Sequence, residues 1–140
     1  MNLLLILALL APPLPPITPE AQAIATCESG DTKTLGSANY TAVNVNVDGT
    51  IDTGAWQFNS YWVWSSTNRW TIITLANNVY DMSSTEFLRR YPTAADASPD
   101  VQYQMFIQLW DNGRGWQHWA SSRPCWEQWL VVRKGRAVWR

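Results

Sequence analysis

The chain combines segments of helical period with one segment in which apolar and polar residues alternate strictly. Residues 18–20 (Thr-Pro-Glu) have the features of a helix start: a hydroxyl at the N-cap, proline at the first helical position and an acid in the first turn. We expect this helix to run through Ser29 and to end at Gly30, a residue type that is common just after helices. Glu28 then lies in the last helical turn.

Strict alternation marks residues 43–47 (Val-Asn-Val-Asn-Val), which precede an Asp-Gly pair and a second run of strand-forming residues at 50–53. Strand-forming residues on both sides of an Asp-Gly pair predict a β-hairpin. This hairpin places Asp52 on its returning strand, and Gly54 marks the end of that strand.

The rest of the chain is expected to be helical. Apolar residues at helical spacing predict an amphipathic helix over 70–82, and a capping box at 83–86 predicts a short helix that ends before Pro92. Residues 98–100 (Ser-Pro-Asp) open a fourth predicted helix, which finishes near Gly113. The side chains of this helix that we expect to point inward are Val101, Met105, Phe106 and Leu109.

These elements predict an α+β fold that is mainly α, in which a small antiparallel β-hairpin lobe faces a helical lobe across a groove. We divide the chain into three parts. Residues 1–17 form a signal-like apolar segment with a proline-rich linker, residues 18–126 form the folded domain, and residues 127–140 form a basic C-terminal tail.

The N-terminal segment indicates export. The apolar run Leu3–Ala11 is too short for a membrane span, which needs about 20 residues, and it has the length of the apolar part of a signal peptide. Residues 21–23 (Ala-Gln-Ala) resemble a cleavage site, but a cut there would remove most of the first helix. We therefore expect a secreted, cell-wall or periplasmic protein that is cut, if at all, in or soon after the prolines at 12–16. An uncleaved short anchor and an apolar arm packed on the domain are the alternatives.

Composition supports a globular domain. Hydrophobic residues make up 46% of the chain and charged residues 15%, which supplies a core and argues against wholesale disorder. The net charge of −1 gives no indication of nucleic-acid binding. Basic residues gather near the C-terminus, where they could contact an anionic polymer or surface; a solvated tail is the plainer alternative.

Tryptophan is the unusual residue, with ten copies. Each indole N–H needs a partner when it is buried, so a core of this size rarely uses so many. Sugar rings present flat C–H faces that stack on aromatic rings. Part of the set could therefore line a saccharide groove, although we expect more than half to lie in the core.

Cys27 and Cys125 allow one disulfide, and a pair of buried thiols is the alternative. The signal-like start of the chain favours the disulfide, because these bonds persist in oxidising compartments. For a loop of roughly 100 residues, chain entropy predicts a stabilisation of about 4–5 kcal/mol.

Glu28 occupies an unfavourable position for a carboxylate. The last turn of a helix presents the negative end of the helix dipole, which destabilises a negative charge and raises the pKa of a carboxyl group. A helix shaped only for folding would carry Lys or Arg there. Glu28 is therefore a candidate functional residue.

Three sequence patterns together resemble the lysozyme superfamily. Residues 27–30 (Cys-Glu-Ser-Gly) at a helix end are similar to the Glu-Ser-Gly signature of lytic transglycosylases and resuscitation-promoting-factor-like domains. Residues 46–60 resemble the N-x-D-G-x-x-D-x-G-x-x-Q-x-N-S hairpin of animal-type lysozymes, and transglycosylase-like domains of phages and actinobacteria carry a similar run. Residues 115–119 (Gly-Trp-x-x-Trp), followed by Cys125, resemble the ending of the same domains. The chain can form only one disulfide, so it is more similar to the bacterial and phage forms than to the animal ones.

The resemblance implies roles for individual residues. It assigns the catalytic acid to Glu28 and a second carboxylate, which stabilises the developing cation, to Asp52. In transglycosylase-like relatives this second carboxylate is often dispensable, so Asp52 could instead only hydrogen-bond the hairpin. The implied substrate-binding residues are Gln57, Asn59 and Trp62, with Tyr61 and Trp116 as looser candidates beside Trp64 and Trp119. The resemblance also implies that Cys125 pairs with Cys27 on the active-site helix.

The implied function is cleavage of the β-1,4 glycosidic bond of peptidoglycan glycan strands by a monomeric, exported or phage-borne enzyme that needs no cofactor. His118 is the single histidine and lacks the companions of a metal site, so we expect a surface or hydrogen-bonded residue and no metal. A non-catalytic saccharide-binding or virion structural protein on the same fold is the main alternative. A small disulfide-clamped interaction domain is a further one.

Overall fold

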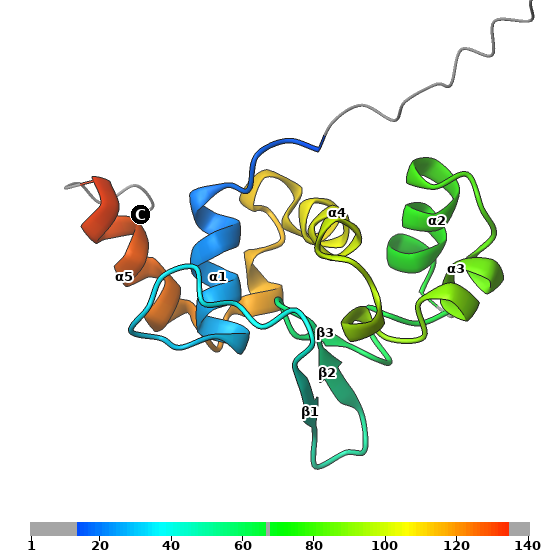
Figure 1. Ribbon diagram of the computed structural model, residues 1–140, viewed down its shortest axis with the longest axis horizontal. Coiled ribbons are helices and arrows are strands. Elements are labelled where there is room, and N and C mark those ends of the chain that lie inside the picture. The colour runs from blue at the N-terminus through cyan, green and yellow to red at the C-terminus, as the bar shows by residue number, and fades with distance from the viewer. Residues whose placement is uncertain (1–13, 67, 135–140) are drawn as a thin grey trace, which may run out of the picture.

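The computed structural model describes residues 14–66 and 68–134 (Figure 1). Within them, the chain forms α-helices and one small antiparallel sheet, which confirms the predicted α+β, mainly α class. The predicted apolar run 3–11 and the end of the basic tail lie outside the described residues. No helix in the described part is long and apolar enough to cross a membrane.

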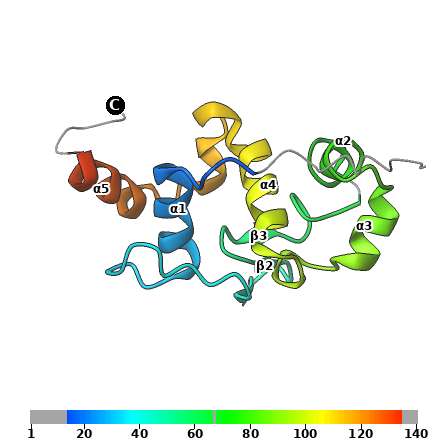
Figure 2. The same cartoon turned by 45° about the horizontal axis from the view of Figure 1, so that its top comes forward.

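Figure 1 and Figure 2 both place α1 and α5 side by side at one end, α2 and α3 at the other, and α4 between them. The β1–β2 hairpin projects from this helical body (Figure 1). The elements in chain order are α1 (Pro19–Ser29), β1 (Val43–Val45), β2 (Ile51–Thr53), β3 (Phe58–Asn59), η1 (Arg69–Ile73), α2 (Thr74–Val79), α3 (Ser84–Arg90), η2 (Ala94–Asp96), α4 (Pro99–Trp110), η3 (Asp111–Gly113), η4 (Trp116–Trp119) and α5 (Arg123–Lys134).

Helix α1 has the predicted bounds. Thr18 caps its start, with its Oγ1 accepting a hydrogen bond from the Ala21 N–H at 3.2 Å. The helix ends at Gly30, but this glycine is extended (φ −101°) rather than left-handed. Glycine is needed there for space, because a Cβ atom would lie 2.6 Å from the Ser37 Oγ.

The predicted hairpin is present, with Asn44 of β1 opposite Asp52 of β2. The Gly49 N–H donates to the Asn46 carbonyl at 3.0 Å, and Gly49 has the positive φ (+85°) of a turn closed by a glycine bulge. A third strand, β3, pairs with β2 and places Asn59 opposite Asp52. The sequence did not predict β3, since its two residues are too few to show a period.

The helix predicted over 70–82 is wrong at both ends. The segment begins as the π-helical turn η1 and continues as α2 only to Val79. Trp70, at the predicted start, is 85% exposed. The π-helical turn η1 is wider than an α-helical turn. It is stabilised by a contact from another helix, because the Gln108 side chain of α4 donates to the carbonyls of Trp70 and Thr71.

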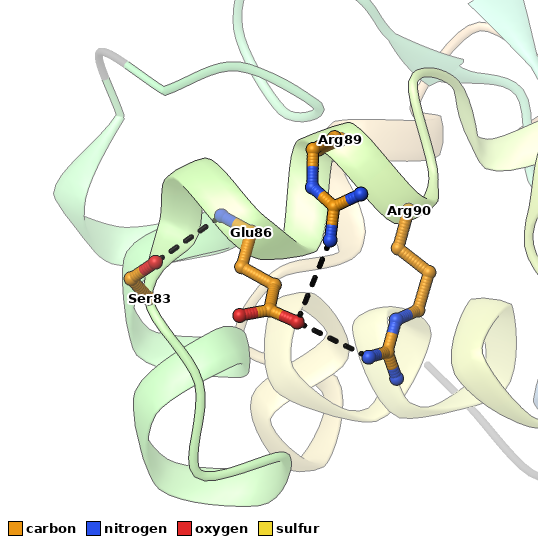
Figure 3. A network of polar contacts seen from close by, with 4 residues as sticks. All are labelled: Ser83, Glu86, Arg89 and Arg90. Atoms are coloured by element: carbon orange, nitrogen blue, oxygen red, sulfur yellow. Dashed lines mark hydrogen bonds and ion pairs between the residues drawn. The ribbon is translucent and has the colours of Figure 1, made fainter.

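Helix α3 forms where the capping box predicted it (Figure 3). The Ser83 Oγ accepts from the Glu86 N–H at 3.1 Å. Figure 3 shows the Glu86 carboxylate pointing along the helix toward Arg89 and Arg90, at 3.8 and 3.2 Å. These ion pairs are exposed, so each contributes little to stability.

Helix α4 supplies the centre of the core, and all four of its predicted inward side chains are buried. Trp56 packs against the rings of Tyr103 and Phe106 on α4, and the ring centroids lie 5.9 and 5.2 Å from that of Trp56. The Tyr103 hydroxyl also donates to the Pro16 carbonyl at 2.9 Å, which attaches the described end of the proline stretch to the domain.

Helix α5 crosses the predicted domain boundary at 126. Leu130, which the sequence placed in a basic tail, is 3% exposed and belongs to the core together with Trp126. The two residues are about one helical turn apart, so they lie on the same face of α5. Residues 127–134 therefore continue the helix that packs on α1 rather than forming a tail.

The disulfide Cys27–Cys125 joins α1 to α5. Of the tryptophans, 56, 64, 119 and 126 are buried, while 110 and 129 are partly buried against the core. The expectation that more than half of the ten serve the core is therefore confirmed.

Candidate active site

A cavity of about 460 Å³ lies between the hairpin lobe and the helical lobe. The end of α1 contributes Glu28, and the end of α4 contributes Leu109. The sheet and the loop after it contribute Asp52, Gln57, Asn59 and Trp62, and the segment at 118–121 closes the other side. The structure thus brings together five of the seven predicted catalytic and substrate-binding residues.

The Glu28 carboxyl is largely removed from solvent. Burial raises its pKa above the ordinary value, and the negative charge of Asp52 adds to the rise. The Ser122 hydroxyl donates a hydrogen bond to Glu28 Oε1, which favours the charged form and partly opposes that rise. The environment therefore favours a protonated carboxyl at the mouth of the cleft.

The sequence predicted this direction but named the helix dipole as the first cause. Desolvation is the largest cause in the structure. Nothing in the local sequence pointed to Ser122, which lies just before α5 and reaches Glu28 because the disulfide holds α5 against α1.

Ser29, which follows Glu28, links the end of α1 to the loop beyond β2. Its hydroxyl lies 2.9 Å from the Ala55 carbonyl and accepts from the Asn39 N–H at 2.9 Å. The serine of the Glu-Ser-Gly pattern thus holds the helix end against the hairpin lobe.

Asp52 is oriented by two amide side chains. Asn46 Nδ2 donates to its Oδ2 at 3.0 Å, and Asn59 Nδ2 donates to its Oδ1 at 2.8 Å. Each carboxylate oxygen of Asp52 therefore accepts one hydrogen bond from an amide, which fixes the orientation of the carboxylate. Asp52 thus has a defined place facing the cleft, whichever of its two predicted roles applies.

Asn59 also positions the aromatic rim of the cleft. Its Oδ1 accepts from the backbone N–H groups of Tyr61 and Trp62, at 3.0 and 3.1 Å. The Trp62 indole is 66% exposed and lines the cleft. Tyr61 does not line it, but its ring meets the Trp62 ring edge-on at 4.7 Å.

Gln57 lines the cleft with a left-handed backbone (φ +51°), an uncommon conformation for a residue other than glycine. Its amide nitrogen donates to the Gly54 carbonyl at 2.9 Å, and its amide oxygen accepts from Asn44. Backbone strain that is held in place by such contacts is frequent at functional sites.

Trp116 is not part of this cleft, contrary to the expectation. It lines a separate cavity with Trp110 and Arg123. Trp64 is buried in the core, whereas Trp119 does line the cleft.

The glycine of the Gly-Trp-x-x-Trp pattern explains how Trp119 arrives there. A Cβ atom at Gly115 would lie 1.7 Å from the Leu109 carbonyl oxygen, so only glycine allows η4 to fold back on the end of α4. This return also brings His118 and Ser121 into the lining of the cleft, and His118 remains exposed there, in agreement with the predicted surface position. Partial burial lowers the pKa of the His118 imidazole, which favours its neutral form.

Within residues 14–66 and 68–134, no group of three or more His, Cys, Asp or Glu side chains is placed to hold a metal ion. No protein-family model matches the chain, and no curated protein matches it in sequence. The geometry of the cleft and the sequence patterns are therefore the basis on which a function can be assigned.

Proposed function

We propose that this protein cleaves the β-1,4 bond between N-acetylmuramic acid and N-acetylglucosamine in peptidoglycan, with Glu28 as the general acid. One observation carries the proposal: a desolvated carboxyl of raised pKa shares a cleft with a second carboxylate that two amides orient. Glycoside cleavage through an oxocarbenium-like transition state needs a carboxylic acid that protonates the leaving oxygen, and it usually uses a second carboxylate that stabilises the developing cation.

In the proposed reaction, Glu28 gives its proton to the glycosidic oxygen as the bond from that oxygen to C1 of the muramic residue breaks. Asp52 stabilises the positive charge that develops at C1 and on the ring oxygen. Water, or the 6-hydroxyl of the same muramic residue, then attacks C1. The proton released by that attack returns to the Glu28 carboxylate, which restores the acid.

The cleft also offers an exposed surface for a sugar. The Trp62 indole provides a flat face at the rim, and an exposed aromatic ring of this kind suits stacking against sugar C–H groups. The two amides of Gln57 and Asn59 are used in holding the hairpin loop together, so we assign them mainly to shaping the cleft.

The single disulfide is compatible with an oxidising compartment outside the cytoplasm. We propose that the protein acts at the cell wall, as a secreted or phage-borne enzyme. Its substrate is insoluble and extracellular, which agrees with the signal-like N-terminus.

The test is a zymogram on peptidoglycan that compares the native protein with Glu28→Gln. General acid catalysis contributes roughly 10²–10⁴-fold, so we expect a loss of that size. Glu86→Gln is the matched control, because it makes the same change at an exposed carboxylate on α3 outside the cleft. A Glu28→Gln protein that clears peptidoglycan at the native rate would falsify the proposal.

Mass spectrometry of the released muropeptides then identifies the nucleophile. A product one water lighter than the reducing-end sugar shows attack by the 6-hydroxyl, and the reducing-end product shows hydrolysis. If the native protein binds peptidoglycan but releases no product, the non-catalytic saccharide-binding alternative replaces the enzyme.

A further inference from the structure

A second cavity, of about 440 Å³, shares no lining residue with the cleft. It lies along η3, η4 and the first turns of α5, and it is lined mainly by tryptophan rings and charged side chains: Trp110, Trp116, Trp126, Arg114, Arg123 and Glu127. The proposed glycan cleavage does not use any of these residues.

Arg123 is held in a fixed position in this cavity. Its guanidinium carbon lies 4.5 Å above the Trp116 ring centroid, a cation–π arrangement. Its Nε donates to Glu127 Oε1 at 2.7 Å, and the two terminal nitrogens of the guanidinium lie outside that bond. A guanidinium oriented in this way loses little conformational entropy when it binds a carboxylate.

Packed aromatic rings form part of the cavity wall. Trp110 and Trp126 meet edge to face, with centroids 6.2 Å apart and planes at 84°. Gly113, beside them, has a left-handed backbone (φ +93°), and a Cβ atom there would lie 3.8 Å from Trp110 Cζ2. With glycine at this position, no side chain covers that edge of the indole.

Both arginines of the cavity are already paired with an acid. Arg114 is engaged by Asp111 through two contacts of 2.6 and 2.8 Å, and both side chains are at least half exposed. Glu127 faces Arg123 and would repel a second acid. A ligand carboxylate must therefore compete with Glu127 for Arg123, which makes Glu127 a determinant of affinity.

We propose that this second cavity binds a carboxylate-bearing muropeptide unit, with the acid of the stem peptide on Arg123 and an apolar sugar or peptide face against the tryptophans. The inference rests on the proposed function for the identity of the polymer. Such a site would hold the protein on the cell wall while the cleft processes a strand.

The experiment measures binding in the full-length Glu28→Gln protein, in which turnover is slowed. N-acetylmuramyl-L-alanyl-D-isoglutamine is titrated against ¹⁵N-labelled protein, and the indole N–H resonances are followed. Its methyl ester, in which the carboxylate is blocked, is the matched control ligand. Trp116→Phe assigns the reporter of the second cavity, and the Trp62 resonance reports on the cleft.

We expect the Trp116 resonance to shift with the acid at an affinity roughly twofold to fivefold higher than with the ester, which is the range for an ion pair that stays partly exposed. Arg123→Gln should remove that preference. Glu127→Gln should strengthen binding of the acid, because Arg123 loses its competing partner. The dipeptide without the sugar tests whether the carboxylate alone is recognised. If it is, the dipeptide binds as tightly as the full ligand.

Equal shifts with the acid and the ester, or shifts at Trp62 alone, would overturn the proposal. Binding at Trp116 does not depend on catalysis, so a native protein without turnover leaves this result readable. Conversely, an active enzyme whose Trp116 resonance does not respond refutes the second site and leaves the proposed function intact.

Discussion

The two walls of the cleft hold their carboxylates in opposite ways. Glu28 ends a helix whose inner face is buried and which a disulfide joins to α5, and its carboxyl has one side-chain donor, Ser122. Asp52 lies on a short sheet whose β1 valines are exposed, and two asparagine amides hold it. One wall depends on burial and a covalent bond, and the other depends on polar contacts.

This difference shows that one fold gives its two carboxyl groups different surroundings. Loss of solvent raises the pKa of Glu28, so this side chain is suited to give a proton. Two amide donors hold the Asp52 carboxylate facing the cleft, where it can stabilise a positive charge. The two walls should therefore respond differently when their supports are removed.

The largest effect is expected from the disulfide that supports the Glu28 wall. The double variant Cys27→Ala/Cys125→Ala opens a loop with a sequence separation of 98 residues. Chain entropy for a loop of roughly this size predicts a loss of about 4–5 kcal/mol in the free energy of unfolding. Urea denaturation measures the loss, and the native protein under reducing conditions is the control. A loss below about 1 kcal/mol would show that α1–α5 packing alone supports this wall.

The Asp52 wall is attached to the helical body through Gln102, which is fully buried on α4. Its Oε1 accepts from the Ala55 N–H at 2.8 Å, and its Nε2 donates to the carbonyls of Tyr40 and Ala97 at 2.9 and 3.0 Å. Gly54 has to be glycine for this contact, because a Cβ atom would lie 2.4 Å from the Gln102 Oε1.

Gln102→Leu should therefore lower the free energy of unfolding by about 3 kcal/mol, because it leaves backbone groups buried without partners. Urea denaturation gives the value. Gln104→Leu, on the same helix but only partly buried, is the control and should change stability by about 0.5 kcal/mol or less. Equal effects from the two variants would mean that the buried contacts of Gln102 do not attach the sheet.

The contribution of Asp52 itself is smaller in the proposed reaction. Asp52→Asn should reduce the rate of peptidoglycan cleavage about tenfold to hundredfold, because it removes charge stabilisation but keeps the acid. Asp48→Asn is the control, since Asp48 bonds Thr50 in the turn and does not line the cleft. A loss as large as that of Glu28→Gln would make Asp52 an obligatory nucleophile, and no loss would limit it to holding the hairpin.

Local patterns predicted the elements that local chemistry determines. The Thr18 cap, the Ser83 cap, the Asp-Gly turn and the inner face of α4 are all present. The elements that were missed lack such a local pattern. β3 has only two residues and forms by pairing with β2, the carbonyls of η1 are engaged by the distant Gln108, and α5 was not predicted as a helix. The tail at 127–140 was predicted from charge alone, although Leu130 in that segment is buried.

The site shows the same division. Glu28, Asp52, Gln57, Asn59 and Trp62 were predicted from motif positions, and they meet in one cleft. Motif spacing could not show that η4 turns its faces in different directions, with Trp116 in the second cavity and His118 and Trp119 in the cleft. That outcome depends on Gly115 packing against Leu109, a contact that appears only in three dimensions.

The smallest effect, and the most direct test of how the Glu28 wall sets its acid, comes from Ser122. Its hydroxyl favours the charged form of Glu28 and so lowers the pKa, against burial and the charge of Asp52. Ser122→Ala removes that bond, so the pKa of Glu28 should rise further. A general acid works only when protonated, so activity falls as the pH rises through its pKa. This fall should therefore move to higher pH in Ser122→Ala.

The measurement is the pH profile of kcat/KM on soluble glycan fragments, which reports the groups of the free enzyme. Ser122→Thr keeps a hydroxyl and should keep the native profile. A Ser122→Ala protein that loses activity equally at every pH would reduce Ser122 to a packing role. If the fall in activity moved to lower pH, the Ser122 hydroxyl would instead stabilise the protonated Glu28 carboxyl. In that case Ser122 would accept a hydrogen bond from the carboxyl and donate its own hydrogen bond to the Trp119 carbonyl, 3.2 Å away.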